Sequence, residues 1–232
     1  MTSIVCKNVS KTFHQGEEVI IGLDNVSITV GESDFVCLSG PSGSGKTPLL
    51  NAMGGLDTPD SGEITVGKTR IDQMSKGELA DLRLNHIGFV FQSYHLIPVL
   101  TARENIEFVM QVQGLQAEQR RQRSEAILRE VGLEGMGDRR PAQLSGGQQQ
   151  RIAVARAIVN HPTLVLADEP TANLDSVTAT QLMDLFVELN LNHRITFVMS
   201  THDVRVMKYA KRLIKMVDGR IVSDLPQVYP PG

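Results

Sequence analysis

The sequence predicts an α/β fold with a central parallel β-sheet, an antiparallel β region beside it and an inserted group of helices. Short apolar runs alternate with amphipathic stretches, which is typical of strand–helix–strand crossovers in a layered core. Three of the runs are apolar throughout, as strands covered by helices on both faces require. Residues 93–160 contain several helix patterns and no convincing strand. These observations predict one α/β domain that carries a helical insertion.

The strands are expected at short apolar or alternating runs bounded by turn residues. Residues 35–39, 163–167 and 195–200 are the continuously apolar runs and are expected to be central parallel strands. The first thirty residues and 63–66 alternate more, which favours an antiparallel sheet. The complete set of expected strands is 4–9, 26–30, 35–39, 63–66, 87–92, 163–167, 195–200, 213–217 and 220–222.

Helices are expected where apolar residues recur at helical spacing. They are 46–54, 76–84, 102–113, 117–131, 146–160, 177–190 and 203–208. The length predicts a single domain, 1–232, with about 1–92 and 161–232 as the core with its β subdomain and about 93–160 as a helical subdomain. The end, 227–232, contains two prolines and is expected to be frayed.

Composition excludes several classes of function. Hydrophobic residues make up 41% and charged residues 21% of the chain, which is ordinary globular usage and unlike a disordered or fibrous protein. The formal net charge is −3 and the basic clusters are short, so no nucleic-acid partner is expected. No signal pattern and no run of about 20 apolar residues is present, so a membrane role needs a partner. Cys6 and Cys37 lie in apolar runs, which favours buried, reduced thiols and a reducing cytosol.

The segment GPSGSGKT, from Gly40 to Thr47, predicts a phosphate-binding loop. It matches G-x-x-x-x-G-K-[ST] and stands between a buried strand and a helix. Gly43 and Gly45 allow backbone N–H groups to surround a phosphate at the positive end of the helix dipole. Lys46 is expected to reach the β- and γ-phosphates and Thr47 to hold Mg²⁺. The predicted nucleotide-binding residues here are Gly40, Pro41, Ser42, Gly43, Ser44, Gly45, Lys46, Thr47 and Pro48. The alternative is a Gly/Ser-rich strand-to-helix turn.

Pro48 departs from what this chemistry favours. A proline is tolerated in the first helical turn, but it has no N–H to donate to a phosphate. A hydrogen bond to a charged group contributes about 1.5–3 kcal/mol, so nucleotide affinity is expected to be lower by about tenfold to a hundredfold. Pro48 is also expected to disfavour helical backbone angles at Thr47 and so to disturb this Mg²⁺ ligand.

Two carboxylates end the apolar run TLVLADEP at 163–170. Asp168 and Glu169 are thereby predicted at the carboxyl end of a strand, where open α/β sheets bind ligands. Asp168 is expected to steady Mg²⁺, and Glu169 to polarise the water that attacks the γ-phosphate. The alternative, an acidic strand end before a proline turn, is common alone and rare beside a phosphate loop.

The sequence LSGGQ, from Leu144 to Gln148, opens a strongly patterned helix. Ser145 and Gln148 fit a capping box, so a well-capped helix is the simpler interpretation. Caps rarely need two glycines, however, and the exposed pair Gly146 and Gly147 at a helix N-terminus is suited to binding phosphate.

These motifs together resemble those of ABC-type ATPases over nearly the whole chain. In order they are the phosphate loop, Gln92 after a strand, LSGGQ, Asp168 with Glu169, NLD at 173–175, and His202 at a strand end. The resemblance implies a P-loop NTPase core that binds ATP and Mg²⁺ and hydrolyses ATP to drive transport. It also implies a head-to-tail homodimer with ATP sandwiched twice.

The resemblance also implies roles for single residues. Phe13 resembles the adenine-stacking aromatic, although core or edge packing is the alternative for a lone phenylalanine. Gln92 resembles the residue that senses Mg²⁺ and the attacking water. His202 resembles the residue that contacts the γ-phosphate, and a satisfied polar residue is the alternative for a histidine at a strand end. The implied catalytic residues are Lys46, Gln92, Glu169 and His202, and the implied metal ligands are Thr47, Gln92 and Asp168.

The resemblance further implies contacts between two chains and with a membrane partner. Ser145, Gly146, Gly147 and Gln148 would contact the nucleotide held by the partner chain, and Asp175 would lie in the dimer loop. IGFVFQSYHLIPVLTARENI, GGLDTPDSG and PTANLDS resemble the subgroup that powers lipoprotein release and macrolide-type efflux. An integral membrane permease would then dock near Ser93 to Leu100, for which packing inside the helical subdomain is the alternative. The chain would be cytoplasmic, peripheral on the cytoplasmic face of the inner or plasma membrane through its permease.

Two other functions stay open at this point. One is an ATP-dependent dimerisation switch or scaffold, related by fold, whose catalysis Pro48 has blunted. The other is a soluble ABC ATPase that acts on DNA or ribosomes, for which the usual coiled-coil or duplicated length is absent. Glu169, Gln92 and His202 favour the hydrolytic motor, because a chain freed from hydrolysis has no chemical need for them.

Overall fold

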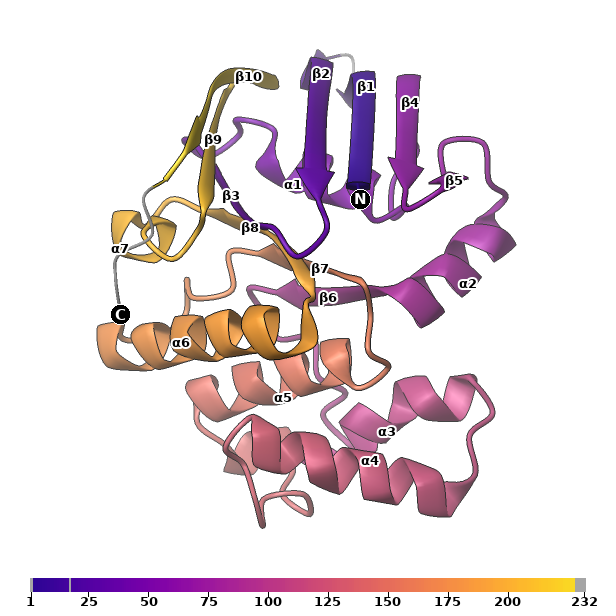
Figure 1. Ribbon diagram of the computed structural model, residues 1–232, viewed down its shortest axis with the longest axis vertical. Coiled ribbons are helices and arrows are strands. Elements are labelled where there is room, and N and C mark those ends of the chain that lie inside the picture. Colours follow the sequence, from indigo (N-terminus) through magenta and orange to yellow (C-terminus); the bar gives the residue numbers. More distant parts are fainter. Residues whose placement is uncertain (1, 17, 228–232) are drawn as a thin grey trace.

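Two β-sheets organise the chain (Figure 1). The computed structural model describes residues 2–16 and 18–227. The larger sheet has six strands in the order β10-β9-β3-β8-β7-β6, and the smaller has four in the order β2-β1-β4-β5. Neighbouring strands from β9 to β6 are parallel, β10 is antiparallel to β9, and the pairs in the smaller sheet are antiparallel. The predicted fold class, a mixed parallel sheet with an antiparallel sheet beside it, is confirmed.

The central strands are those that the apolar runs predicted. The strands of the larger sheet are Phe35–Ser39 (β3), Ile87–Phe91 (β6), Leu164–Asp168 (β7), Thr196–Thr201 (β8), Arg212–Val217 (β9) and Arg220–Pro226 (β10). β3, β7 and β8 each have a neighbour on both sides, and all their residues are buried except half-buried Asp168. Continuous apolar sequence therefore corresponds here to strands covered on both faces.

The hairpin of the smaller sheet is much longer than predicted. Its strands are Thr2–Gln15 (β1), Glu18–Gly31 (β2), Ser61–Val66 (β4) and Thr69–Arg70 (β5). The predicted strands 4–9 and 26–30 cover only the inner parts of β1 and β2, whose pairing continues to Gln15 opposite Glu18. The described residues between 11 and 21 are half-buried or exposed, so they lack the alternation of buried positions that marks a strand in sequence. β5, with two residues, was not predicted.

The helices agree with the predicted ones to within three residues at each end. They are Lys46–Met53 (α1), Lys76–His86 (α2), Ala102–Val112 (α3), Ala117–Glu130 (α4), Gly146–Ile158 (α5), Ser176–His193 (α6) and Val204–Met207 (α7), with a short 3₁₀ helix at Pro141–Gln143 (η1). Residues 92–163 are all described and contain α3, α4, η1 and α5 but no strand, as predicted. Within the described chain, no helix is long and apolar enough to cross a membrane. The predicted frayed end lies, apart from Gln227, outside the described residues.

The buried core lies on both faces of the larger sheet. Phe35 and Cys37 of β3 belong to a cluster with the side chains of α3 to α6, whereas Val36 and Leu38 belong to a second cluster with α1 and the smaller sheet. Successive strand residues point to opposite faces, so β3 contributes to both clusters. Figure 1 shows the corresponding arrangement, with α1 on one side of the larger sheet and α5 and α6 on the other. This double cover holds the ends of the central strands in fixed positions.

The two cysteines are free and buried, as predicted. Burial raises the pKa of the Cys6 thiol, and that of Cys37, to about 12. Both thiols therefore stay protonated near neutral pH and act as small apolar side chains of the core.

Candidate functional site

The candidate site lies at the carboxyl ends of four neighbouring parallel strands. The register places Ser39 of β3 beside Thr201 of β8, and Asp168 of β7 beside both Ser200 of β8 and Phe91 of β6. Each strand is followed directly by a residue that the sequence singled out: Gly40 after β3, Gln92 after β6, Glu169 after β7 and His202 after β8. One edge of the sheet therefore collects four of the segments that the sequence singled out. Ligands bind at this edge in open α/β sheets.

The loop between β3 and α1 has the backbone geometry of an anion cradle. Gly43 has a φ of 77° and open space where a Cβ would stand, whereas a Cβ on Gly45, with a φ of 99°, would meet the Gly22 carbonyl oxygen at 2.6 Å. Glycine is thus required at Gly43 by backbone conformation and at Gly45 also by close packing. The first helical hydrogen bond of α1 runs from the Leu49 N–H to the Gly45 carbonyl at 3.0 Å. The preceding N–H groups have no partner within the helix, and they form the positive end of its dipole.

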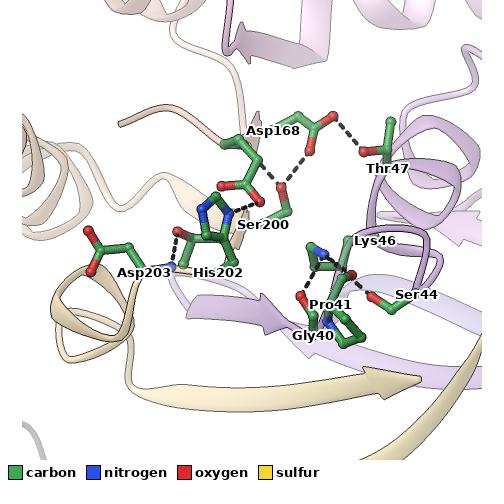
Figure 2. Close-up of polar contacts among 11 residues, drawn as sticks. Gly40, Pro41, Ser44, Lys46, Thr47, Asp168, Ser200, His202 and Asp203 are labelled. Atoms are coloured by element: carbon green, nitrogen blue, oxygen red, sulfur yellow. Dashed lines mark hydrogen bonds and ion pairs between the residues drawn. The ribbon is translucent and has the colours of Figure 1, made fainter. Parts of the chain in front are cut away.

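The Lys46 ammonium lies inside this loop. Its Nζ donates to the carbonyl oxygens of Gly40 and Pro41, both at 2.8 Å, and to Ser44 Oγ at 3.4 Å (Figure 2). The side chain is only 7% exposed. A cation within a cradle of backbone N–H groups favours binding of a phosphate group.

Thr47 is helical despite the proline that follows it, so the prediction that Pro48 disturbs its backbone is wrong. α1 begins at Lys46, which places Pro48 in the first turn, where a helix needs no N–H. The Thr47 hydroxyl is also directed into the site, because its Oγ1 donates to Asp168 Oδ2 at 2.8 Å. This bond connects α1 to the end of β7.

Asp168 lies between Thr47 and Ser200, as Figure 2 shows. The buried Ser200 hydroxyl donates to Asp168 Oδ1 and accepts the Glu169 N–H at 3.0 Å. One hydroxyl group on β8 thus orients both consecutive acidic residues. Ser200 was missed from the sequence, where the available signal was a hydroxyl residue near the end of an otherwise apolar run.

Glu169 and His202 form a hydrogen-bonded pair at the same edge. Glu169 Oε1 lies 2.9 Å from His202 Nδ1. The Glu169 side chain is 16% exposed and that of His202 69%, so the carboxylate lies inside and the imidazole at the rim. Glu169 also has a φ of 47°, a left-handed conformation that is uncommon for non-glycine residues and frequent at functional sites. The pair can hold or move a proton at the mouth of the site.

One cleft of about 700 Å³ is lined by Lys46, Thr47, Asp168, Glu169 and His202. Its polar wall consists of residues 41–48 with Gln92, Asp168, Glu169 and His202, and its apolar wall of Phe13, Ile20, Ile21 and Gly22 from the β1–β2 hairpin. A Cβ on Gly22 would lie 2.4 Å from Phe13 Cε2, so the Phe13 ring rests on the glycine of the opposite strand. Ile20, Ile21 and Gly22 were not predicted, because they lie in the part of the hairpin that the sequence pattern missed. A cleft with one apolar and one phosphate-binding wall suits a nucleotide.

The oxygen atoms of the site fit Mg²⁺ bound together with phosphate. The Thr47 hydroxyl and the Asp168 carboxylate are adjacent, and both are the hard oxygen ligands that this cation prefers. Across residues 2–16 and 18–227, no group of three or more His, Cys, Asp or Glu is arranged to hold a metal ion. Mg²⁺ is usually held by one or two side-chain oxygens, substrate phosphates and water rather than by an all-protein cage. Gln92 lines the cleft nearby, and its backbone carbonyl accepts a hydrogen bond from Asn173 Nδ2 at 3.0 Å.

The LSGGQ segment lies outside this cleft. Ser145 and Gln148 form the predicted capping box at the start of α5, and with Gly147 and Thr178 they line a separate pocket of about 420 Å³. None of the described residues that line that pocket belongs to the phosphate loop. Asp175 caps the neighbouring helix α6, because its Oδ1 accepts the N–H groups of residues 177 and 178. The two helix starts therefore lie side by side and away from the chain's own phosphate loop.

The fold and this cleft define a phosphate-loop nucleotide-binding protein, and comparison with known proteins identifies the family. A family model described as ABC transporter matches residues 23–172. MJ0796, an uncharacterized ABC transporter ATP-binding protein of Methanocaldococcus jannaschii, is 44% identical over 225 residues, which cover 95% of this chain and 96% of the relative. The macrolide export ATP-binding/permease protein MacB of Escherichia coli is 43% identical over 221 residues, which cover 95% of this chain and 34% of the relative. The chain thus spans about a third of that exporter's length.

Solved structures support the same assignment. One is described as the dimeric structure of a post-hydrolysis state of the ATP-binding cassette MJ0796 bound to ADP and Pi, and a second as the dimeric structure of MJ0796. Both have a TM-score of 0.90, cover 96% of this chain and 98% of their own, and are 41% and 42% identical to it. The chain therefore belongs to the ABC transporter family of ATP-binding proteins. Its predicted activity class, an ATPase of this family, is confirmed.

Proposed function

We propose that this chain hydrolyses ATP as a homodimer to drive an integral membrane permease of the lipoprotein-release or efflux type. The observation that carries the proposal is that one cleft contains the Lys46 cradle, the Thr47–Asp168 pair and the Glu169–His202 pair. The similarity to an exporter whose name joins an ATP-binding part to a permease supports the transport role. The chain would lie peripherally on the cytoplasmic face of the membrane, attached through that permease.

Binding of ATP would use both walls of the cleft. Phe13 would stack on the adenine ring. Stacking of a base on an aromatic side chain contributes about 1–3 kcal/mol. Lys46 and the N–H groups of residues 42–47 would bind the β- and γ-phosphates. Thr47, Asp168 and Gln92 would hold Mg²⁺, and the cation would supply charge neutralisation on the phosphate oxygens.

Hydrolysis would use the residues at the ends of β6, β7 and β8. The Glu169 carboxylate would orient the attacking water and accept its proton, a general-base contribution of about 10²- to 10⁴-fold. His202 would contact the γ-phosphate while its Nδ1 holds Glu169 in place, and Gln92 would orient the same water. Ser200 supports this arrangement because it holds the Glu169 backbone and the Asp168 carboxylate together.

The LSGGQ residues would act on the nucleotide of the second chain. Ser145, Gly146, Gly147 and Gln148 lie exposed or half-buried at the start of α5, away from the chain's own cleft. A helix N-terminus favours an anion, and the γ-phosphate of a partner-bound ATP would supply it. Asp175, which caps the adjacent α6, would lie in the dimer loop. In a head-to-tail dimer, the LSGGQ segment of each chain would contact the nucleotide bound by the other chain.

A groove between α2, α3 and α5, next to the segment from Ser93 to Leu100, would receive the permease. It measures about 350 Å³, and its lining includes the apolar side chains of Leu56, Phe89 and Val109. The lining residues include Arg83 and Arg156 but no Asp or Glu, which favours an occupant with an apolar face and an acidic or carbonyl group. The segment from Ser93 to Leu100 would form one edge of the docking site. The His95 ring lies 4.8 Å from the ring of Phe91, which lines the groove.

The test of this function is the variant Glu169→Gln. We expect phosphate release to fall by about a hundredfold or more while ATP binding persists, because the amide keeps the shape of the carboxylate but is not a base. An ATP-bound dimer should then accumulate, measured by light scattering at saturating ATP and Mg²⁺. Glu188→Gln, an exposed carboxyl group on the outer face of α6, is the matched control.

Each result decides between functions. A Glu169→Gln chain that stays monomeric at saturating ATP would count against the sandwich dimer. Unchanged phosphate release would remove Glu169 from the mechanism. The alternative function, a dimerisation switch with catalysis blunted by Pro48, is disfavoured because Thr47 keeps its helical backbone and its bond to Asp168.

A further inference from the structure

Arg156 of α5 holds the segment that follows Gln92. Its Nη1 donates to the His95 carbonyl oxygen at 2.7 Å, and its Nη2 donates to the Tyr94 carbonyl oxygen at 3.0 Å. The side chain is half-buried and lines the groove between α2, α3 and α5. A planar guanidinium with parallel donors is suited to bind two adjacent carbonyl groups at once.

The two carbonyl groups belong to a strained turn. Tyr94 has a φ of 61° and His95 a φ of 49°, so two consecutive non-glycine residues adopt the left-handed conformation. Such residues persist only where their surroundings stabilise them. The Tyr94 hydroxyl also packs on the start of α5, because a Cβ on Gly146 would lie 2.8 Å from it. The turn is thus held to α5 by Arg156 at one end of the helix and by packing at the other.

Side chains also hold Phe91 and Gln92, the residues that precede this turn. Gln150 of α5, which is fully buried, donates to the Phe91 carbonyl at 3.4 Å, and Asn173 donates to the Gln92 carbonyl at 3.0 Å. Gln92 is therefore enclosed between two attachments to α5, Gln150 before it and Arg156 after it. Gln92 lines the nucleotide cleft, whereas Arg156 lines the groove.

We infer that Arg156 is a positioning residue for Gln92, acting through the Tyr94–His95 turn from the groove side of the molecule. The inference rests on the proposed function, in which Gln92 orients the attacking water. Arg156 itself lines no part of the nucleotide cleft. Its loss should therefore slow the chemical step. ATP binding should stay nearly unchanged, because Arg156 contacts neither Lys46 nor the Thr47–Asp168 pair, which would still bind the phosphates and Mg²⁺.

The kinetic test is Arg156→Met, which keeps the length of the side chain and removes its donors. We expect kcat for phosphate release to fall by about tenfold, because a misplaced Gln92 orients the attacking water less well, and KM to change by less than about twofold. Arg156→Lys should recover part of the rate, because one ammonium can reach a single carbonyl. Arg120→Met is the matched control, since Arg120 is also half-buried and donates to one loop carbonyl, that of Leu115 at 2.7 Å.

A double variant tests whether Arg156 acts through Gln92. If it does, Arg156→Met should lower kcat by less than about twofold in a Gln92→Ala background, because the two changes remove one shared effect. The same tenfold loss in both backgrounds would overturn the inference, as would a change confined to KM. An unchanged kcat in the single variant would overturn it as well.

Hydrogen exchange supplies a readout that does not need activity. Arg156→Met should speed amide exchange in residues 93–97, and Arg120→Met should not. Unchanged exchange there would show that the turn does not depend on Arg156 and would overturn the inference. If the unaltered chain releases no phosphate, the proposed function fails, while exchange still decides whether Arg156 holds the turn.

Discussion

Pro48 stands where the helix and the cleft place different demands on one residue. The helix needs no N–H at this position, because the first bond of α1 is made by Leu49. The cleft does need one, because an N–H at the start of α1 points toward the phosphate position. The conformational bias that a proline imposes on the preceding residue is overcome at Thr47, which stays helical and bonded to Asp168. The residue therefore affects ligand binding more than folding.

We predict that Pro48→Ala tightens ATP binding by about tenfold to a hundredfold, because it restores one N–H donor to a charged acceptor. Pro48→Thr should have a similar effect, since the donor belongs to the backbone. Titration with a fluorescent ATP analogue in the presence of Mg²⁺ measures the change. Equal affinity in all three chains would show that the missing donor has no role.

The starts of α5 and α6 form a close contact between two elements. A Cβ on Gly147 would lie 2.3 Å from Thr178 Cγ2, while the Thr178 hydroxyl donates to Asp175 Oδ2 at 2.6 Å. Thr178 is thus fixed in its rotamer by the residue that caps α6, and it cannot move aside at little cost. The second glycine of LSGGQ has a packing requirement of its own, separate from any contact with phosphate.

We predict that Gly147→Ala destabilises the chain by about 1–3 kcal/mol, the usual cost of forcing an extra methyl group into a packed contact. The double variant Gly147→Ala with Thr178→Ser should recover this loss, because serine keeps the hydroxyl and removes Cγ2. Urea unfolding followed by circular dichroism measures both. A single variant as stable as the unaltered chain would exclude the steric explanation.

The elements differ in how well their sequence predicted them, and the reason is burial. Central strands are buried along their whole length and helices have periodic burial, so 35–39 and 102–113 were found nearly to the residue. The described residues in the outer arms of β1 and β2 are half-buried or exposed without alternation, so nothing in their pattern marks pairing. The residues of the cleft that belong to dense motifs were predicted from the sequence, whereas Ser200 beside the cleft and Arg156 in the groove were not. Each of these is one polar residue in an ordinary segment, and only the folded chain brings it to its partners.

At the scale of the whole molecule, groups with shifted pKa values limit stability on both sides of neutral pH. The Thr12 hydroxyl lowers the pKa of Asp60, and the bond from Arg70 lowers that of Asp72. Burial raises the pKa of Cys6 and Cys37 from 9.0 to about 12. The unfolded chain therefore takes up protons more readily in acid at the two aspartates, and it loses protons more readily in alkali at the two thiols.

We predict that these groups contribute fully to stability at pH values between the ordinary pKa of the aspartates, 3.8, and that of the thiols, 9.0. Their contribution is smaller in stronger acid and in stronger alkali. The contribution of Asp60 and Asp72 is present above their ordinary pKa of 3.8 and is lost as pH falls through their lower folded values. That of the thiols is lost as pH rises above 9.0. Urea unfolding from pH 3 to pH 10 measures the dependence. Asp72→Asn should flatten the acid side and Cys37→Ala the alkaline side, and unchanged slopes would contradict the assignment.

The position of β3 in the larger sheet has a consequence for synthesis. β3 carries the phosphate loop at its end, yet both of its neighbours, Thr196–Thr201 and Arg212–Val217, come from the late part of the chain. While the chain is being made, FVCLS is an apolar strand with two open edges, the kind of segment that pairs with other chains. Contacts between such distant segments also form slowly. Shielding by a chaperone should therefore matter most before residue 217 has left the ribosome, and the ATP site is among the last parts of the molecule to be completed.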